Sequence, residues 1–363
     1  MLNFDDLKLA VEALSGGRNT VVFDTVAQNG IFYPNIMVRI PMFPGNAVLP
    51  GASNDPHPMF RVGGVTVPEI LISKYQNVLL ANRAYSLPFR APATGMTFDV
   101  AKMFCENKGS GWHLMTNAEY AGLELWCLQE GVQLRGHTGG GGNALVPHER
   151  GTLMGEYTAT GSGPASWYHD GTQFGVADLI GNAWEWAAGL RLQNGEINII
   201  PDNDAALGGD QGPNSKLWRA VSPNGMMVNP GVIDSCKFDS TVPGDSQTVE
   251  MDLGGGVILR THRYYPHYTG DDISNDYLFQ SVQFDKITFD EDVAQALNRL
   301  KLLGVMPATG SLDGRLFLRN YGDRTALRGG ACDGSAGLFA LNLMHGRAGA
   351  AAHRGFRAAY VKL

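Results

Sequence analysis

Hydrophobic and polar residues alternate along this chain in short blocks that end at glycine, proline or asparagine. Residues 5–15 carry apolar side chains three and four positions apart and stop at a glycine pair, which predicts a short helix within an N-terminal element, 1–31. Beyond it, apolar runs at 36–43 and 70–75 have the length and the bounding residues that are typical of strands. The pattern therefore predicts a strand-rich body after the first helix.

Two further helices are predicted from their start signals. Thr97 is in position to cap a helix over 98–107. Thr116 and Glu119 form the capping box of another helix, which ends at Gly131. These helices lie among strand-like runs, so the pattern favours an α+β fold.

The second half of the chain has fewer clear signals. Residues 257–260 form an apolar run that predicts a strand. Asp290 stands where it would cap a helix over 291–303, and Gly304 closes that pattern. We expect these elements to pack on the same body, because composition changes little along this part of the chain.

Composition supports a loop-rich globular fold. With 363 residues and 44% hydrophobic content, the chain is long and apolar enough to bury a sizeable core. Glycine accounts for 47 of the 363 residues, and charged residues make up only 17%. Since globular domains usually contain about 7% glycine and about 25% charged residues, this balance favours loops and strands over a helical bundle.

Charge and hydropathy exclude several classes of partner. The net charge is −7 with a pI near 5.7, and no run of lysine or arginine supplies a footprint for nucleic acid or an anionic membrane. The N-terminus lacks the basic and apolar regions of a signal peptide, and no apolar run approaches the ~20 residues that span a bilayer. We expect no nucleic-acid partner and no membrane insertion.

The residue pattern indicates no metal or cofactor site. The four cysteines are widely separated, without the spacing of a zinc site or a disulfide framework. Asp202, Asn203 and Asp204 do not form a recognisable calcium loop. We therefore expect no cofactor, with a stabilising Ca²⁺ as an alternative that no motif indicates.

The last part of the chain combines a regular frame with chemically arbitrary filling. The frame consists of glycine turns and apolar runs at 327–330, 337–343 and 355–361. The filling, at 331–336 and 344–354, has no hydrophobic period, no paired carboxylates and no cluster of metal ligands. A constant scaffold with arbitrary insertions indicates a surface that displays side chains for binding.

This frame resembles the variable region of proteins diversified by retroelements of phages and bacteria. In that family, asparagine codons of a template are rewritten at their adenines, which places many residue types at each affected site. The resemblance implies a variable region over 327–357. It also implies ligand-binding positions at Ala331, Cys332, Asp333, Met344, His345, Gly346, Gly349, Ala350, His353 and Arg354. All of these residue types except methionine can arise from an AAC codon by changes at its adenines.

A second motif, Gly-Asn-Ala-Trp-Glu-Trp at 181–186, resembles the formylglycine-generating enzyme superfamily, a branch of the C-type lectin fold. The strand at 36–43, the helix at 98–105 and the closing Phe356-Arg357 follow in that family's order. The resemblance implies one C-type lectin-like domain over 32–363 with an insertion at 191–317. Its expected structural residues are Trp184, Glu185, Trp186, Arg328, Gly329, Gly330, Phe356 and Arg357. Aromatic residues usually anchor a core, so we expect Trp184 and Trp186 to be buried, with Glu185 satisfying nearby backbone groups.

Two classes of function follow from these resemblances. Formylglycine-generating enzymes work through two cysteines near their C-terminal Arg-Gly-Gly segment, whereas only Cys332 stands there in this chain. A soft-metal oxidase site needs more than one thiolate to hold its ion, which disfavours this alternative. The favoured function is non-catalytic binding of a host cell-surface protein or glycan by a phage tail-tip or receptor-binding protein. Such a protein would reside in the virion, or in the cytoplasm before assembly, with homo-oligomerisation left open.

Overall fold

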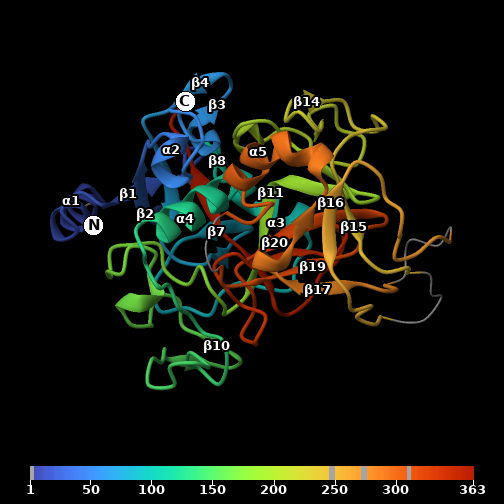
Figure 1. Ribbon diagram of the computed structural model, residues 1–363. Coiled ribbons are helices and arrows are strands. Elements are labelled where there is room, and N and C mark those ends of the chain that lie inside the picture. Colours follow the sequence, from blue (N-terminus) through green and yellow to red (C-terminus); the bar gives the residue numbers. More distant parts are fainter. Residues whose placement is uncertain (1–3, 245–249, 271–275, 309–311) are drawn as a thin grey trace.

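The computed structural model describes residues 4–244, 250–270, 276–308 and 312–363 as a mixed α+β structure, rich in strands and with few helices (Figure 1). The α-helices are α1 (Phe4–Leu14), α2 (Gly45–Val48), α3 (Phe98–Glu106), α4 (Asn117–Gln129) and α5 (Leu297–Leu302). Short 3-10 helices are η1 (Pro58–Phe60), η2 (Ala165–Trp167), η3 (Asp204–Leu207), η4 (Phe284–Lys286) and η5 (Glu291–Ala296). The α+β class expected from the sequence is confirmed.

One sheet brings the two ends of the described chain together. It contains, in spatial order, β1 (Asn19–Phe23), β2 (Pro34–Pro41), β5 (Glu69–Ser73), β23 (Ala358–Tyr360) and β8 (Trp112–Leu114). All neighbouring strands in it are antiparallel. The predicted strands at 36–43 and 70–75 are confirmed as β2 and β5, which pair with Val38 opposite Ile72.

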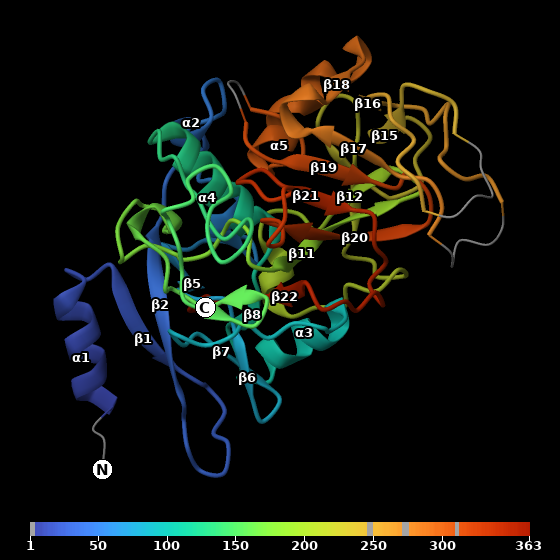
Figure 2. The ribbon, with the colours of Figure 1, turned by 90° about the horizontal axis from the view of Figure 1, so that it is seen from below.

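The second sheet is larger and mixed, and it continues into the segment 191–317. Its main path runs β17 (Gln280–Gln283), β19 (Arg315–Leu318), β21 (Leu341–Leu343), β20 (Asp323–Arg328), β11 (Trp184–Gln193), β12 (Glu196–Ile199), β15 (Lys237–Ser240), β16 (Val257–Arg260) and β18 (Thr288–Phe289). Three strands join beside it: β13 (Arg219–Val221), β14 (Met227–Val228) and β22 (Arg354–Phe356). Figure 2 shows β19, β21, β20 and β11 side by side in the middle of the molecule. The strand predicted at 257–260 is confirmed as β16.

Three hairpins complete the strands. They are β3 (Arg61–Val62) with β4 (Val65–Thr66), β6 (Val78–Leu80) with β7 (Arg83–Tyr85), and β9 (Leu153–Met154) with β10 (Tyr157–Thr158). The hairpin of β9 and β10 lies within 136–163, a glycine-rich stretch that contains four consecutive glycines at 139–142. It extends from the lower edge of the molecule in Figure 1.

The two helices with clear start signals form as predicted. The Thr97 hydroxyl accepts a hydrogen bond from the Val100 amide at 3.3 Å at the start of α3. In α4 both halves of the capping box are present, since Thr116 accepts from the Glu119 amide and Glu119 accepts from the Thr116 amide. Each side-chain cap satisfies an amide that the helix itself cannot pair, and this local chemistry explains why the sequence predicted both starts.

The helix predicted over 291–303 is shorter than expected. Residues 291–296 form the 3-10 helix η5, and only Leu297–Leu302 are α-helical. Asp290 makes no capping hydrogen bond, so its predicted capping role is wrong. Its carboxylate instead lies 3.3 Å from the Arg260 guanidinium on β16, an ion pair that holds the entry to η5 against the sheet.

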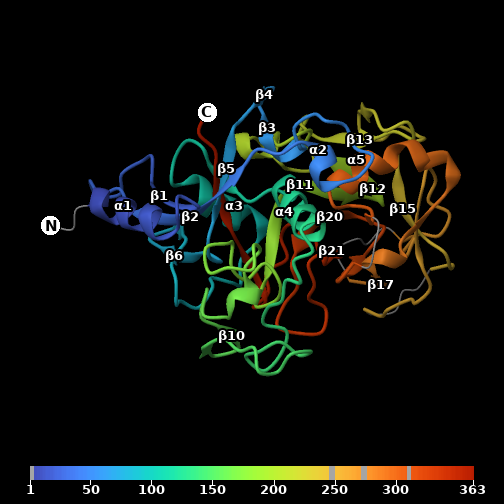
Figure 3. The ribbon, with the colours of Figure 1, turned by 60° about the vertical axis from the view of Figure 1, so that its left-hand side comes forward.

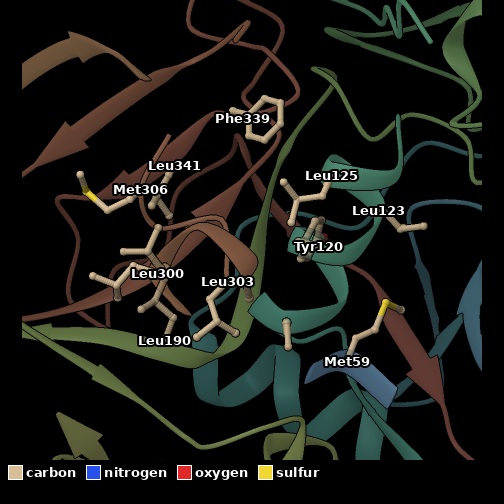
Figure 4. Close-up of a cluster of buried hydrophobic side chains, with 14 of the residues drawn as sticks. Met59, Tyr120, Leu123, Leu125, Leu190, Leu300, Leu303, Met306, Phe339 and Leu341 are labelled. Atoms are coloured by element: carbon tan, nitrogen blue, oxygen red, sulfur yellow. The ribbon is translucent and has the colours of Figure 1, made fainter. Parts of the chain in front are cut away.

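The main hydrophobic core lies where α4 and α5 meet the large sheet. Figure 4 shows Tyr120 and Leu125 of α4 near Leu190 of β11 and Leu300 of α5, with Phe339 above them. All five side chains are almost completely buried. Since α4 is covered on nearly all sides, its apolar residues do not follow the one-sided pattern of a surface helix.

The predicted N-terminal helix forms as α1, but it covers little of the body. In Figures 1–3 it lies at the edge of the molecule beside β1. Leu14 is 78% exposed and Leu9 is also exposed. Within the described ranges, no helix combines the length and the apolar character that crossing a bilayer requires.

A candidate binding face formed by the C-terminal loops

Two loops near the C-terminus, 331–336 and 344–354, connect strands that pair with neighbours in the large sheet. We call them the C-terminal loops. The first connects β20 to β21, which pair with Leu327 opposite Asn342. The second connects β21 to β22, which runs parallel to β11 with Arg354 opposite Trp184. Their endpoints therefore belong to the large sheet, and only their interiors are free of strand pairing.

Glycines make the close turns at the ends of the first loop. Gly329 and Gly330 have φ values of +84° and +89°, which glycine adopts without the steric penalty of a Cβ. A Cβ on Gly330 would overlap the backbone of Ala336, and one on Gly337 would lie 2.5 Å from the Cα of Gly314. The loop 331–336 can close over the sheet only because these positions lack side chains.

Arg357 and Glu185 form a buried ion pair beneath this region. The guanidinium Nη2 lies 2.8 Å from Glu185 Oε1, and Nε lies 3.0 Å from Oε2. The Tyr120 hydroxyl and the Gln76 amide also donate to this carboxylate. Arg357 further donates to the Ser73 carbonyl oxygen at 2.9 Å. Glu185 thus accepts from side chains, and the expectation that it satisfies backbone groups is wrong.

The two tryptophans flanking Glu185 are buried, as expected. The Trp186 indole N–H donates to the Met96 carbonyl oxygen at 3.0 Å. The Trp184 ring packs edge-on against Phe317, with 5.9 Å between ring centroids. Phe356 is buried in the same cluster. Aromatic residues from β11 and β22 thus fill the space below the C-terminal loops.

Arg328, on β20, contacts α4 and the residues that follow α5. It donates to the Asn117 side-chain oxygen at 2.6 Å and to the Gly304 carbonyl oxygen at 2.9 Å, and it lies 3.4 Å from the Glu124 carboxylate. Burial raises the pKa of Glu124 to about 7, and the charge of Arg328 opposes that rise. The predicted structural role of Arg328 is thus reflected in contacts with α4 and with the residues after α5.

The ten positions predicted to bind ligand differ in exposure. Asp333, Ala350 and His353 are exposed, and a second group is half-buried: Cys332, His345, Gly346 and Gly349. Ala331, Met344 and Arg354 are buried, with exposed fractions of 3%, 5% and 7%. The expectation that all ten lie on the surface is wrong for these three.

The physical reason lies in the strands that bound the loops. Ala331 packs into the cluster that contains Trp184 and Phe356. Met344 continues directly from β21, and its amide donates to the Asn342 side chain at 3.0 Å. Arg354 is the first residue of β22. Each belongs to the end of a frame segment, although the sequence pattern assigned it to the filling.

The exposed parts of the two loops adjoin each other. Burial and the neighbouring Arg354 lower the pKa of His353, whereas Asp333 of the first loop opposes that shift. An electrostatic effect of this kind requires the two side chains to be close, because exposed charges are screened over about 8–10 Å. Asp333 of the first loop therefore lies near His353 of the second.

The hairpin of β9 and β10 also contributes to this face, which the sequence did not predict. The Tyr157 hydroxyl donates to the Ala352 carbonyl oxygen and lies 3.1 Å from the Thr94 hydroxyl. Burial raises the pKa of the Cys332 thiol, and Asp333 and Glu156 add to that rise. No sequence signal linked a glycine-rich loop to residues some 200 positions later.

Two arginines outside the predicted set converge on the second loop. Arg319 and Arg324 both donate to the Met344 carbonyl oxygen, at 3.1 and 3.2 Å. Arg319 also pairs with Asp276 at 2.6 Å and with Glu250 at 3.1 Å. Nothing in the sequence pattern brought these residues together, because they come from four segments, at 250, 276, 319–324 and 344.

Arg347 makes its contacts at the surface, unlike the buried Arg328 and Arg357. Its Nε donates to Asp99 at 2.9 Å, and its Nη1 donates to the Gln211 carbonyl oxygen at 2.7 Å. The Arg347 carbonyl oxygen accepts from the Phe98 amide at the start of α3. The middle of the second loop is thereby attached to α3 at the surface.

The arrangement presents no assembled metal centre in the described ranges. No group of three or more histidine, cysteine, aspartate or glutamate side chains there is placed to hold an ion. Cys332 is half-buried, and the other three cysteines are buried. A raised thiol pKa disfavours the thiolate form that a nucleophile or soft-metal ligand requires, so Cys332 is not activated by its surroundings.

Comparison with known proteins supplies no family for this chain. No protein-family model matches its sequence, and no curated protein sequence is significantly similar to it.

Proposed function

We propose that this protein is a non-catalytic ligand-binding protein of the C-type lectin fold, similar to the formylglycine-generating enzymes, whose C-terminal loops are diversified by a retroelement. In this proposal it is a phage tail-tip or receptor-binding protein that recognises a host surface protein or glycan. The chemistry that distinguishes one ligand from another resides in the exposed side chains of residues 331–354.

The observation that carries the proposal is the contrast between frame and loops. Arg328 and Arg357 hold the frame through buried ion pairs with Glu124 and Glu185. None of these contacts uses an exposed residue of the C-terminal loops. A face whose backbone is held from below tolerates many side chains, and that tolerance is what a diversified binding surface needs.

The oxidase alternative has less support. Cys332 is the only cysteine in these loops, and its pKa is raised rather than lowered. An oxidase of the formylglycine-generating type needs thiolates to bind its metal. We therefore favour ligand binding over oxidase chemistry as the function of the C-terminal loops.

The proposal is tested by exchanging the exposed residues together. In the triple variant Asp333→Ala, Ala350→Ser and His353→Ala, exposed substitutions should each change the free energy of unfolding by less than ~0.5 kcal/mol. Binding of the purified protein to a panel of bacterial cells should be lost or redirected to other strains. The control variant exchanges Asp6, Glu130 and Lys286, which are exposed on other parts of the surface, for alanine.

Binding that survives the triple exchange at full strength, or that the control variant lowers equally, would contradict the proposal. Unfolding of the triple variant would contradict it as well, because the frame would then depend on these side chains. The melting temperature of each variant, followed by circular dichroism, separates the two failures.

A further inference from the structure

Arg354 is a buried arginine without a partner in the described part of the chain. It is 7% exposed, and its guanidinium makes no ion pair and no hydrogen bond with any described residue. Its Nε is fully shielded from solvent. Arginine stays charged at any pH that a protein experiences, and charged groups are almost never buried unless they are paired. No described residue therefore neutralises the charge of Arg354 through an ion pair or a hydrogen bond.

The surroundings of Arg354 leave an excess of positive charge. Arg319 lies near Arg354, and Arg324 lies near Arg319. The two nearby carboxylates, Asp276 and Glu250, are already paired with Arg319. Asp323, a further carboxylate near Arg324, is paired with Arg191 at 3.3 Å. Arg319, Arg324 and Arg354 therefore share two carboxylates, Asp276 and Glu250. Burial and the charges of all three arginines depress the pKa of His345, which keeps that ring neutral at pH 7. One further negative charge would balance the cluster.

The cluster is approachable from the side of the second loop. A Cβ added to Gly349 would lie 2.7 Å from Arg354 Nη1, so a side chain at this position would crowd that nitrogen. Gly346 and Gly349 are half-buried, and Ala350 is exposed. The glycine at position 349 therefore places no side chain against the end of the guanidinium.

We infer that Arg354 recognises an oxyanion of the ligand, either a carboxylate or a sulfate or phosphate group. The inference rests on the proposed function, because it names the chemistry of a ligand at the same face. The planar guanidinium presents two parallel N–H groups to such an anion, and these charge-assisted bonds are stronger than those between neutral groups. An incoming anion would supply the partner that Arg354 lacks among the described residues.

The test uses the full-length protein and small anions as probes. Binding of sodium sulfate, sodium phosphate and sodium acetate is followed by isothermal titration calorimetry at constant ionic strength, with chloride as the reference. We expect saturable binding of at least one probe to the wild-type protein. Arg354→Gln should abolish that binding, and Arg354→Lys should weaken it by about tenfold or more, because lysine keeps the charge but loses the bidentate geometry.

Arg39→Gln is the matched control, since Arg39 lies on β2, outside the C-terminal loops, and is already paired with Glu12 and Glu69; this variant should retain anion binding. Acetate binding alone would identify a carboxylate, and sulfate or phosphate binding alone would identify the other group. Absence of saturable binding in the wild type, or equal binding by Arg354→Gln, would overturn the inference. If Arg354→Gln did not fold, undiminished binding by Arg354→Lys would overturn it.

The failure of this inference differs from the failure of the proposed function. If the wild-type protein binds cells but no small anion, the binding face stands and the oxyanion assignment falls. If the protein binds anions through Arg354 while the triple exchange of Asp333, Ala350 and His353 leaves cell binding unchanged, the reverse holds.

Discussion

At the scale of single residues, buried aromatic and charged side chains hold the region beneath the C-terminal loops. Trp184 is 4% exposed and contacts Phe317, which approaches from another strand of the large sheet. Trp184→Ala should therefore lower the free energy of unfolding by about 3–5 kcal/mol, which urea denaturation would measure. A variant that kept its stability but lost its ligand would instead place Trp184 in a binding pocket.

His57 gives the stability a dependence on pH. It is fully buried between the Leu302 carbonyl oxygen and the Met59 amide, and burial lowers its pKa from 6.5 to about 4. Between these pH values the unfolded chain binds a proton that the folded chain does not. Stability should therefore be complete above pH 6.5 and fall as the pH decreases to 4, by at most about 3 kcal/mol from this residue.

The variant His57→Gln isolates this contribution, because glutamine keeps a hydrogen-bonding side chain but does not titrate. Urea unfolding of both proteins at several pH values between 4 and 7 should show a shallower loss of stability for the variant. Equal slopes would show that His57 does not carry the effect. Other buried histidines with lowered pKa values, such as His169 and His267, should preserve part of the slope in the variant.

At the scale of elements, the ends of the first C-terminal loop tolerate no side chain, whereas its middle does. A Cβ on Gly337 would meet the Gly314 backbone at 2.5 Å, while one on Gly334 would have no atom within 4 Å. Gly337→Val should thus cost more than about 2 kcal/mol, since overpacked sites must shift their backbone. Gly334→Val, the matched control, should cost less than ~0.5 kcal/mol. Melting temperatures of the two variants would check this, and equal losses would show that the loop has no distinct frame.

Local signals explain which elements the sequence could predict. The starts of α3 and α4 depend on Thr97 and Thr116, whose caps involve residues three positions away. The predicted start at Asp290 failed because Arg260, from another strand, attracts its carboxylate. Elements whose signals are local were thus predictable, and those determined by distant partners were not.

The same distinction applies to the candidate site. The glycine frame of the C-terminal loops was visible in the sequence, because turns need particular residues. The burial of Met344 and Arg354 was not visible in the sequence, since it depends on residues that only the fold brings near. Examples are Arg319 and Arg324, which donate to the Met344 carbonyl oxygen. The contribution of Tyr157 was missed for the same reason.

At the scale of the whole molecule, the large sheet joins the segment 191–317 to the strands beneath the C-terminal loops. Strand β12 pairs with β11, and β11 pairs in turn with β20 and β22. The five-stranded sheet adds β23, which follows the second loop and lies between β5 and β8. Both ends of the second loop are therefore supported by extended sheets, in keeping with the rigid frame that the proposed function requires.

The central claim is that retroelement diversification supplies the filling of these loops, and sequencing the DNA around the gene tests it most directly. We predict a nearby reverse transcriptase gene and a near-copy of the region encoding residues 327–357. Mismatches between the two copies should be confined to adenines of the near-copy and should fall in the codons for 331–354. A neighbourhood without such a copy, or mismatches spread evenly over all bases and over the frame codons, would contradict the account.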